Sequence, residues 1–519
     1  MRPTGSDQAQ EGEVGVSATP PQEPPNAPAT GGALVEVDIE RLDEAAAGVG
    51  ATREGQAASV VGTLPGETVK LRIVRVSRQT GHLYGALQEI TRASPDRVPS
   101  PCPNFLRCGG CDLLHASMDA QHRFKTEKVA AALAALGVVV SDIEPAPADV
   151  GYRALAKFVV GADGTLGSYA PYSHDVVSMS GCVVHAPEIE GVAESIRAWL
   201  TQRPPPFDLR YVLMRASTWT RNVAVTLVSR GDEADGLAPL LERLKTDVRV
   251  ARIAFHANPS EGDSLLGRGP IRTAFARGPH EERLGDIVHH IAEGAFSQVN
   301  PTATARAYKI VSRLAAPKGA RILDLYAGSG GISLRLLADG AAHVVAVESS
   351  AAAIEAARTA AKANGLSGGL AGLYAEPVEA FLDRLRRPEE PCAVQCVGLN
   401  ADFDVVIANP PRKGLSPPVL NGLTSLGWDR LVYMSCNPSS LARDLEELIR
   451  LDSRIRIEGA YPVDLFPQTK HVETVVLVAR DSVPRDRPGV RKPDPQGRSV
   501  RSLHAPRMAL DPKIVPHKP

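Results

Sequence analysis

Apolar and polar residues alternate in short segments near the start of the chain, at residues 34–39, 58–61 and 69–76. Alternation with a period of two predicts β-strands with one buried face, and turns such as Leu64-Pro-Gly66 separate them. We therefore predict a small β-barrel or sandwich over residues 33–92. Lys70 and Arg72 fall on one side of the last segment, and this basic face suits RNA or simply solvent.

From about residue 291 the pattern changes, because short apolar runs now alternate with helical stretches. Five runs have the length and composition of buried strands, at residues 321–325, 343–347, 404–408, 431–434 and 474–478. Helices are predicted to begin near Gly331 and to cover residues 350–364. This alternation predicts a doubly wound, Rossmann-like α/β domain with a mostly parallel sheet over residues 291–480.

Between these regions lie a Pro-rich joint, a cysteine cluster, a predicted helix at about residues 118–136 and a strand-rich stretch. We predict a mixed α+β middle domain over residues 93–290. Residues 1–32 and 481–519 contain few large apolar residues, which predicts disordered tails. From Arg480 onward there are ten Lys/Arg against four Asp/Glu. This excess suits a solvated extension as well as electrostatic help in holding a phosphate backbone.

The composition is that of a cytosolic globular protein. The 519 residues predict about two to four globular units, and 43% hydrophobic with 23% charged residues can form large cores. The longest nearly uninterrupted apolar run, from Val129 to Val140, is far shorter than the roughly 18 residues that a membrane span needs. Seven cysteines are too few for a disulfide scaffold. We therefore expect a cytoplasmic monomer in a reducing compartment, without membrane association.

A glycine-rich turn follows the first predicted strand of the α/β domain, in Asp324-Leu-Tyr-Ala-Gly-Ser-Gly-Gly331. Its glycines let a ligand approach the backbone at a helix N-terminus. Glu348 ends the next predicted strand, where a carboxylate can accept hydrogen bonds from both hydroxyls of a ribose. The turn lacks the third spaced glycine of a dinucleotide binder, which favours S-adenosylmethionine over NAD. A tight turn beside a surface glutamate is the alternative.

A second turn, Asn409-Pro-Pro-Arg-Lys-Gly414, follows another predicted strand at the ligand-binding edge of the sheet. In amino-group methyltransferases an aromatic residue follows a similar Pro-Pro pair and stacks on the target base. Here Arg412 occupies that position, which disfavours transfer to an exocyclic amine.

Cys436 lies just past the end of a predicted strand, in Tyr433-Met-Ser-Cys-Asn-Pro438. A helix is expected to begin near Ser439, and a helix N-terminus lowers the pKa of a nearby thiol. Cys436 is therefore a candidate nucleophile, and a packed structural cysteine is the alternative. Glu473 follows a Pro-containing loop, where a carboxylate can act as general base or simply face solvent.

Together these two residues fit one chemical problem. Carbon 5 of uracil is not nucleophilic enough to attack a sulfonium methyl group, but addition of a thiolate to carbon 6 turns carbon 5 into an enolate carbon. After methyl transfer a base must remove the proton from carbon 5, so that the thiolate can leave. Cys436 and Glu473 are a pair that such a reaction needs.

With these residues in view, the chain resembles the S-adenosylmethionine-dependent RNA 5-methyluridine methyltransferases, from about residue 33 to residue 480. Five motifs occur in the family order, at Phe296-Ser-Gln-Val-Asn-Pro301, Asp324-Leu-Tyr-Ala-Gly328, Asn409-Pro-Pro-Arg412, Ser435-Cys-Asn-Pro438 with Leu441-Ala-Arg-Asp444, and Phe466-Pro-Gln-Thr-Lys-His-Val-Glu473.

The resemblance implies a function, a site and a partner. Methylation of uridine carbon 5 in transfer or ribosomal RNA would use Cys436 as nucleophile and Glu473 as proton acceptor. The implied cofactor-binding residues are Gln298, Tyr326, Glu348 and Asn409. The first barrel would be the small RNA-binding module known as TRAM. One departure stands out: the family usually has Asp at the position of Asn409, and Asn loses the charge but gains a donor.

Four cysteines are a second mark of the family. The spacing of Cys102, Cys108 and Cys111, with Cys182 some seventy residues on, resembles the ligands of a [4Fe-4S] cluster in many members. By count alone four thiolates suit iron-sulfur or zinc equally, and unpaired core cysteines are a further alternative. The implied role is structural or RNA-positioning. Cys392 and Cys396 receive no assignment.

Other readings stay open at this point. An RNA-binding homologue with altered catalysis is the main alternative, with Asn409 as the suspect residue, and a DNA or amine methyltransferase is a weaker one. Gly151-Tyr-Arg153 and Lys157 are candidate RNA contacts or ordinary surface residues. A flipped or looped-out uridine is expected, because ring carbons 5 and 6 cannot be reached within a stack.

Overall fold

The computed structural model describes most of the chain. The described residues are 32–202, 209–231, 235–260, 265–266, 269–291, 297–386 and 402–481. Phe296, Cys392, Cys396 and all but the ends of the two predicted tails lie outside these residues.

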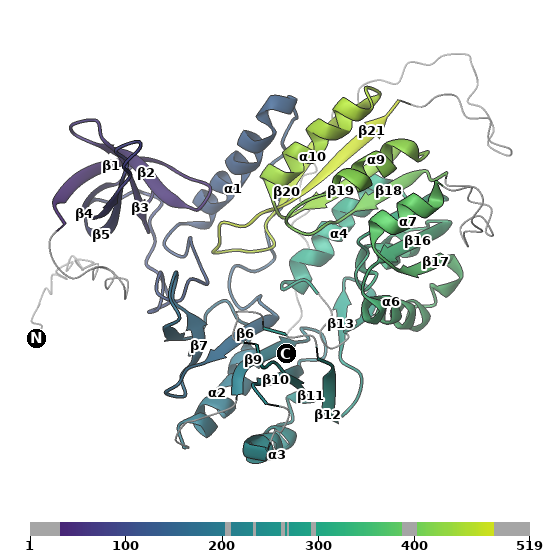
Figure 1. Ribbon diagram of the computed structural model, residues 1–519, viewed down its shortest axis with the longest axis horizontal. Helices are drawn as coiled ribbons and strands as arrows, with labels where there is room; N and C mark the ends of the chain where they lie inside the picture. The colour runs from purple at the N-terminus through teal and green to yellow at the C-terminus, as the bar shows by residue number, and fades with distance from the viewer. Residues whose placement is uncertain are drawn as a thin grey trace, which may run out of the picture. The chain divides into compact units, whose positions relative to one another are not determined.

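The N-terminal strands form a closed barrel in the order β1-β2-β3-β5-β4 (Figure 1). The strands are β1 (Leu34–Leu42), β2 (Ala47–Thr52), β3 (Ala57–Val61), β4 (Thr68–Val76) and β5 (Leu83–Arg92). Val69 and Leu71 of β4 are fully buried in its core, as the alternation predicted. On the outer face, however, Lys70 pairs with Glu89 at 2.8 Å. The face is therefore less basic than predicted.

A helix and a second sheet follow. The helix α1 (Met118–Leu133) continues into a 3-10 turn at Ala134–Leu136. The sheet has the order β12-β11-β10-β9-β6-β7-β8. Its strands are β6 (Leu155–Val160), β7 (Leu166–Tyr169), β8 (Val176–Ser178), β9 (Leu209–Ala216), β10 (Val223–Ser229), β11 (Val250–Ala257) and β12 (Ile271–Ala276).

Helices α2 (Pro187–Leu200) and α3 (Ala238–Thr246) pack on one face of this sheet, against side chains that include Phe158, Val212 and Val225. Because side chains alternate along a strand, the neighbouring positions Lys157 and Arg215 point to the other face. A 3-10 turn (Asp235–Leu237) precedes α3, and the hairpin of β13 (Glu281–Leu284) and β14 (Ile287–His290) leads to the last domain.

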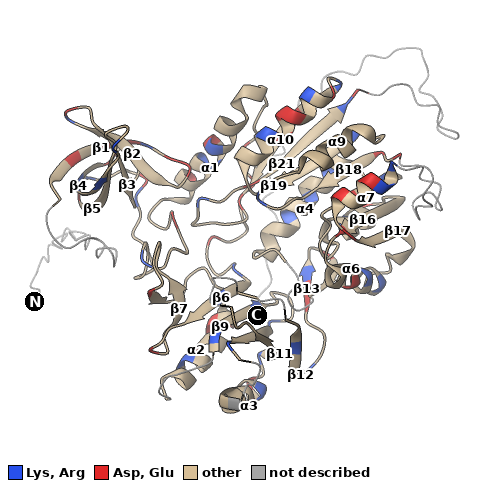
Figure 2. Ribbon diagram, viewed as in Figure 1, with Lys and Arg blue, Asp and Glu red and all other residues tan. Residues whose placement is uncertain are grey.

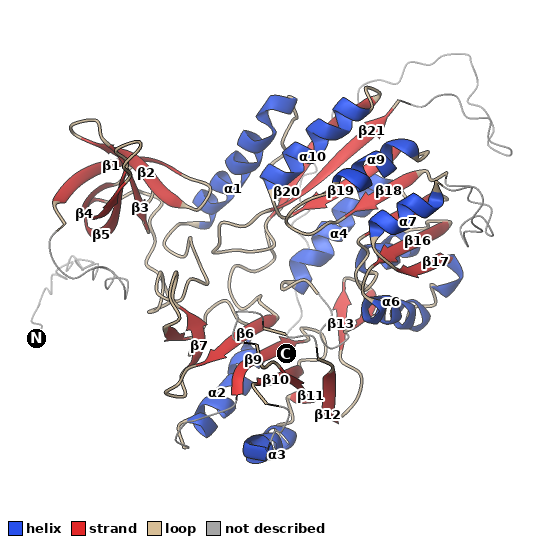
Figure 3. Cartoon of the chain, in the orientation of Figure 1, coloured by secondary structure: helices blue, strands red, loops and turns tan. Residues whose placement is uncertain are grey.

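The C-terminal domain has a seven-stranded sheet in the order β17-β16-β15-β18-β19-β21-β20. The strands are β15 (Arg321–Leu325), β16 (His343–Glu348), β17 (Leu370–Ala375), β18 (Val405–Ala408), β19 (Arg430–Ser435), β20 (Ile455–Val463) and β21 (Glu473–Arg480). The first five are parallel, whereas β20 and β21 are antiparallel additions. The predicted doubly wound, mostly parallel sheet is confirmed (Figure 3).

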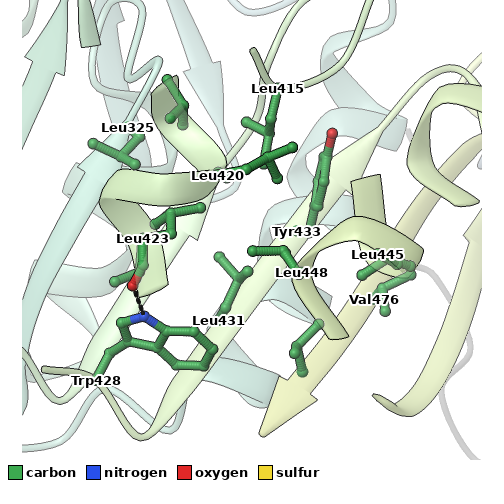
Figure 4. Packing of buried hydrophobic residues seen from close by; sticks show 14 of the residues in the cluster. Leu325, Leu415, Leu420, Leu423, Trp428, Leu431, Tyr433, Leu445, Leu448 and Val476 are labelled. Carbon is green, nitrogen blue, oxygen red and sulfur yellow. Dashed lines mark hydrogen bonds between the residues drawn. The ribbon is translucent and has the colours of Figure 1, made fainter. Parts of the chain in front are cut away.

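Helices cover both faces of this sheet. They are α4 (Pro301–Ala315), α5 (Gly331–Ala338), α6 (Ala351–Ala363), α7 (Val378–Leu385), α9 (Pro417–Ser425) and α10 (Pro438–Leu451), with a 3-10 turn at Ser367–Gly369. Helices α4, α5 and α6 contribute to one core, and α1, α7, α9 and α10 contribute to the other. In the second core, the indole N–H of Trp428 donates a hydrogen bond of 2.8 Å to the carbonyl of Leu423 (Figure 4).

Charged residues of both signs occur along α7 and α10 (Figure 2). Several apolar residues of these helices, among them Phe381 and Leu445, are fully buried in the core. Among the described residues, no helix is both long and apolar enough to cross a membrane.

Candidate active site

The predicted site residues lie around one cavity of about 1090 Å³ at the carboxyl edge of the parallel strands. Small-molecule sites usually span about 300–1,000 Å³, so this cavity has room for more than one ligand. All ten residues predicted from the sequence line it: Gln298, Tyr326, Glu348, Asn409, Cys436, Glu473, Cys102, Cys108, Cys111 and Cys182.

The glycine-rich turn forms one wall of the cavity. Tyr326, Gly328 and Gly330 all have positive φ, at 60°, 55° and 79°, so the chain turns sharply between β15 and α5. A Cβ atom at Gly328 would meet no other atom within 4 Å, which means that open space borders the turn. The turn therefore leaves room for a ligand close to its backbone.

Glu348 closes this turn from the end of β16. Its Oε2 accepts a hydrogen bond of 3.1 Å from the backbone N–H of Gly328, and its Oε1 accepts one of 2.9 Å from Ser350 N–H. A carboxylate oxygen can accept more than one hydrogen bond, so capacity for ribose hydroxyls is left. Gln298 and Asn409 line the same cavity, which brings the predicted cofactor residues together.

Cys436 and Glu473 are brought together by strand register. Strands β19 and β21 are antiparallel, and their last paired residues are Ser435 and Thr474. One step further along both strands, the register sets Cys436 opposite Glu473. The charge of Glu473 raises the pKa of the Cys436 thiol, in keeping with this proximity.

The environment of Cys436 differs from the prediction. Asn437 caps α10 next to it, but the pKa of the thiol is raised and not lowered. Burial is the main cause, and the carboxylate of Glu473 adds to it; the hydrogen bond and charge of Arg412 act in the opposite direction. Location at a helix N-terminus, the only feature visible in the sequence, is outweighed by desolvation.

Glu473 is buried, with 4% of its surface exposed. Burial raises its pKa to about 8, although Arg412 lowers it. Among the described residues, no protein group hydrogen-bonds its Oε2 atom. A buried carboxyl group with a raised pKa and a free oxygen is suited to accept a proton near neutral pH.

The role of Arg412 was not predicted from the sequence. In the sequence it marked only the absence of an aromatic residue after the Pro-Pro pair, but in the structure its charge lowers the pKa of both Cys436 and Glu473. Its backbone carbonyl accepts hydrogen bonds from Asn437 Nδ2 at 3.1 Å and from Ser440 Oγ at 3.0 Å. The start of α10 therefore fixes the turn that carries this arginine.

Asp444 of α10 holds the same turn at its far end. This fully buried carboxylate accepts hydrogen bonds of 2.7 Å from Leu415 N–H and from the hydroxyl of Tyr433. Its position in the motif Leu441-Ala-Arg-Asp444 was the only sequence signal for this function.

The four cysteines Cys102, Cys108, Cys111 and Cys182, here called the cysteine quartet, line another part of the cavity. Burial is the main cause that raises the pKa of the Cys111 thiol, and the charges of the other three thiols raise it further. Cys111 therefore lies within electrostatic reach of the other three. Yet among the described residues, no three Cys, His, Asp or Glu side chains form a group able to hold a single metal ion.

Basic side chains line the middle-domain wall of the cavity. Arg153, Lys157 and Arg215 all contact it, and the last two share one sheet face, because Leu155 pairs with Arg215 and Lys157 with Leu213. Burial lowers the pKa of Lys157, and the charges of the two arginines lower it further. This wall is therefore a region of concentrated positive charge.

Two family descriptions match the chain. Residues 28–82 match the TRAM domain, and residues 282–481 match the family described as tRNA (Uracil-5-)-methyltransferase. The predicted identity of the first barrel is thereby confirmed.

Known proteins of similar length also match. An uncharacterized RNA methyltransferase of Halalkalibacterium halodurans is 33% identical over 473 residues, which are 87% of this chain and 98% of that protein. One from Geobacter sulfurreducens is 32% identical over 483 residues, 88% of this chain and 92% of that protein.

A solved structure is similar over almost its whole length. The Pyrococcus abyssi tRNA (uracil-54, C5)-methyltransferase, crystallised with S-adenosyl-L-homocysteine, is 26% identical and superposes with a TM-score of 0.66. The match covers 86% of this chain and 99% of that one. It supports the predicted order of a small barrel followed by a Rossmann-like domain.

Proposed function

This chain belongs to the tRNA (uracil-5-)-methyltransferase family, and from that premise we propose that it methylates carbon 5 of a uridine in RNA, with S-adenosylmethionine as methyl donor. One observation carries the proposal. Cys436 and Glu473 face each other beside Arg412, in the same cavity as the glycine-rich turn. A nucleophile, a base and a nucleoside-type cofactor site together match the chemistry of uracil carbon 5.

We assign the cofactor to the wall formed by Tyr326, Gly328 and Glu348, with Gln298 and Asn409 beside it. Open space at Gly328 and the remaining acceptor capacity of Glu348 fit a ribose. Bound S-adenosylmethionine would supply an electrophilic methyl group on a sulfonium sulfur. Asn409 can still accept a hydrogen bond through its amide oxygen, so the loss of the usual Asp is compatible with binding.

In the proposed reaction the Cys436 thiolate adds to carbon 6 of the uracil and forms a carbon–sulfur bond. Electron density moves to carbon 5, which would form a bond to the methyl group of S-adenosylmethionine as the bond from that methyl to sulfur breaks, leaving S-adenosylhomocysteine. Glu473 then takes the proton from carbon 5, and the electron pair of that bond restores the ring double bond as the carbon–sulfur bond breaks. Thiolate and carboxylic acid remain, and transfer of the proton to solvent resets the site.

The protonation states set a pH dependence. With a pKa of about 8, Glu473 is mostly neutral at pH 7 in the free protein. The raised pKa of Cys436 acts in the same direction. Because both groups must be ionised to act, the rate should rise with pH through about 8 as Glu473 ionises, and should continue to rise at higher pH as the Cys436 thiol ionises. Arg412 opposes both increases and thus holds the pair closer to its active form.

For the RNA we propose a path over the wall with Arg153, Lys157 and Arg215. Concentrated positive charge favours a phosphate backbone. The target base would leave its stack and enter the cavity, because ring carbons 5 and 6 cannot be reached within a stack.

We further propose that the cysteine quartet holds a [4Fe-4S] cluster. The charges of the other three thiols raise the pKa of Cys111, and Arg153 lowers it, so a bound cation would help these thiols to stay ionised. By count, four thiolates suit zinc as well as iron-sulfur, and the resemblance of the cysteine spacing to the cluster ligands of the family favours iron-sulfur. A bound cluster would tie residues 102–111 to Cys182. Iron and sulfide analysis of anaerobically purified protein tests this assignment.

The function itself is tested by incubating the protein with methyl-labelled S-adenosylmethionine and unmodified total RNA, followed by nucleoside mass spectrometry. Label in 5-methyluridine is expected, and separation of transfer from ribosomal RNA would identify the substrate class. Label in another nucleoside, or cofactor binding without label, would contradict the proposal; the second result would favour an RNA-binding homologue with altered catalysis.

A further inference from the structure

The loop between β20 and β21 ends just before Glu473, so its conformation, together with the strand register, decides where that carboxylate lies. At its centre Gln468 has a φ of 68°, in the left-handed region that residues other than glycine rarely adopt. Such a conformation persists only where the surrounding structure holds it. The groups that hold Gln468 therefore also position Glu473.

Gln468 is held by residues 112–121, which lie far from it in the sequence. Its carbonyl accepts hydrogen bonds from the backbone N–H groups of Asp112 and Leu113, at 3.0 and 2.9 Å. Gln121 of α1 binds it twice: Gln121 Oε1 accepts from Gln468 N–H at 2.8 Å, and Gln121 Nε2 donates to Gln468 Oε1 at 2.9 Å. Both backbone polar groups of this strained residue are thus satisfied by residues 112–121.

The same segment also binds the loop two residues later. The Asp112 carboxylate accepts a hydrogen bond of 3.1 Å from Lys470 N–H and forms an ion pair of 2.7 Å with Lys470 Nζ. Lys470 is three residues before Glu473. Asp112 directly follows Cys111, so the backbone that carries one thiol of the quartet continues into the group that grips the loop.

A buried ion pair fixes the start of the loop. Lys125 Nζ lies 2.7 Å from Asp464 Oδ1, both side chains are fully buried, and Lys125 also donates to the carbonyl of Phe466 at 3.0 Å. Breaking a buried pair leaves a charge without a partner and destabilises the fold. This pair anchors the loop, but a substitution of either residue would destabilise the whole fold, so it would not test the role of the loop in catalysis.

Cys436 is anchored in a different way. It lies between β19 and α10, where Asn437 and Ser440 bind the turn of Arg412, and none of these contacts involves the 464–471 loop. A change in residues 112–121 therefore reaches Glu473 without directly reaching the nucleophile.

We propose that Asp112 and Gln121 are positioning residues for Glu473, so that the cysteine quartet region controls proton removal from carbon 5 and not addition of the thiolate. This inference rests on the proposed function. It predicts that two steps can be separated. Without the contacts that Asp112 and Gln121 make with the loop, here called the clamp, methyl transfer still occurs, but the methylated covalent adduct breaks down to product slowly.

The test uses the full-length Asp112→Ala variant with substrate RNA, and measures methylated covalent adduct and released 5-methyluridine in the same samples. Product release should fall by about tenfold to a hundredfold, because misplacing a catalytic group by about 1 Å costs a factor of this order. Adduct should accumulate, while the rate of its formation stays within about twofold of wild type by the same argument. Hydrogen exchange should show lost protection at residues 466–471.

Matched variants separate positioning from general destabilisation. Asp119→Asn removes an exposed carboxylate from the first turn of α1 and should leave the ratio of adduct to product unchanged. Asp112→Asn keeps an acceptor for Lys470 N–H and should restore part of the product release. Gln121→Met, which has a similar volume but no hydrogen bonds to Gln468, should behave like Asp112→Ala.

Two results would contradict the proposal that Asp112 and Gln121 position Glu473. One is an unchanged ratio of adduct to product in folded Asp112→Ala and Gln121→Met proteins; the other is an equal loss of adduct formation and product release. Failure of the proposed function looks different, because the wild-type protein would then form neither adduct nor 5-methyluridine.

Discussion

Cys436 and the cysteine quartet line one cavity, and burial raises the pKa of Cys436 as it does those of Cys111 and Cys182. Their neighbours differ. Cys436 stands opposite a carboxyl group and beside Arg412, whereas the charges that raise the pKa of Cys111 are those of the other three quartet thiols. A lone thiol with an acid–base partner is suited to covalent catalysis, and thiols that repel one another are suited to share a cation. The surroundings, and not the residue type, separate nucleophile from ligand.

Cys436→Ala should have the largest effect of the substitutions considered. Loss of the thiol opposite Glu473 should reduce 5-methyluridine formation by about a thousandfold or more, as removal of a catalytic nucleophile generally does. Binding of S-adenosylmethionine, measured by calorimetry, should remain, because Cys436 is not among the residues assigned to the cofactor. Wild-type product formation by this variant would show that the thiol is not the nucleophile.

Glu473→Gln should have the next largest effect. It retains the shape of the side chain but cannot accept the carbon 5 proton, so turnover should fall by about 10²–10⁴-fold. Methylated covalent adduct should accumulate, seen as an RNA-linked band in a denaturing gel. Glu458→Gln, an exposed change on the adjacent strand β20, is the control. Full turnover by Glu473→Gln without adduct would remove Glu473 from the base role.

Cys182→Ser tests the other half of the comparison. Replacing one quartet ligand should reduce the iron content and lower product formation by about 10- to 100-fold, the usual cost of disturbing a metal site. Adduct formation should continue, unlike in Cys436→Ala. Cys392→Ser removes a thiol without a proposed role and should retain wild-type iron. Equal iron in both variants would contradict the assignment of the quartet.

Arg412→Gln should have the smallest effect, and its signature lies in the pH profile. Arg412 lowers the pKa of both Cys436 and Glu473, so its removal should raise both. The rising limb of kcat/KM should therefore move to higher pH than in the wild type, with much of the rate recovered in alkaline buffer. Lys413→Gln, the neighbouring exposed cation, should leave the limb in place. An unchanged limb in Arg412→Gln would show that this arginine does not tune the pair.

Much of the fold could be predicted because it depends on local patterns. The strand predicted at residues 321–325 is β15, and the predicted helix at residues 350–364 is α6 within a residue at each end. Buried parallel strands are continuous apolar runs, and the turn that follows them carries the glycines. These signals are contained within a few neighbouring residues.

The rest depends on contacts that no local pattern reveals. Asp112 meets Lys470, and Gln121 meets Gln468, across more than three hundred residues of sequence. The direction of the pKa shift of Cys436 was predicted wrongly, because the helix N-terminus is visible in the sequence and the extent of burial is not. Arg412 was noticed for what it excludes, since its distance to the thiol exists only in the folded chain.

Attack of Cys436 on uridine carbon 6, opposite Glu473, can be trapped. The wild-type protein is incubated with S-adenosylmethionine and RNA containing 5-fluorouridine, the complex is digested, and the adduct is sequenced by mass spectrometry. Fluorine cannot leave carbon 5 as a proton, so we expect a methylated, fluorinated nucleotide attached to the peptide that contains Cys436. Attachment at another cysteine, or no adduct from a protein that converts ordinary uridine to 5-methyluridine, would contradict it.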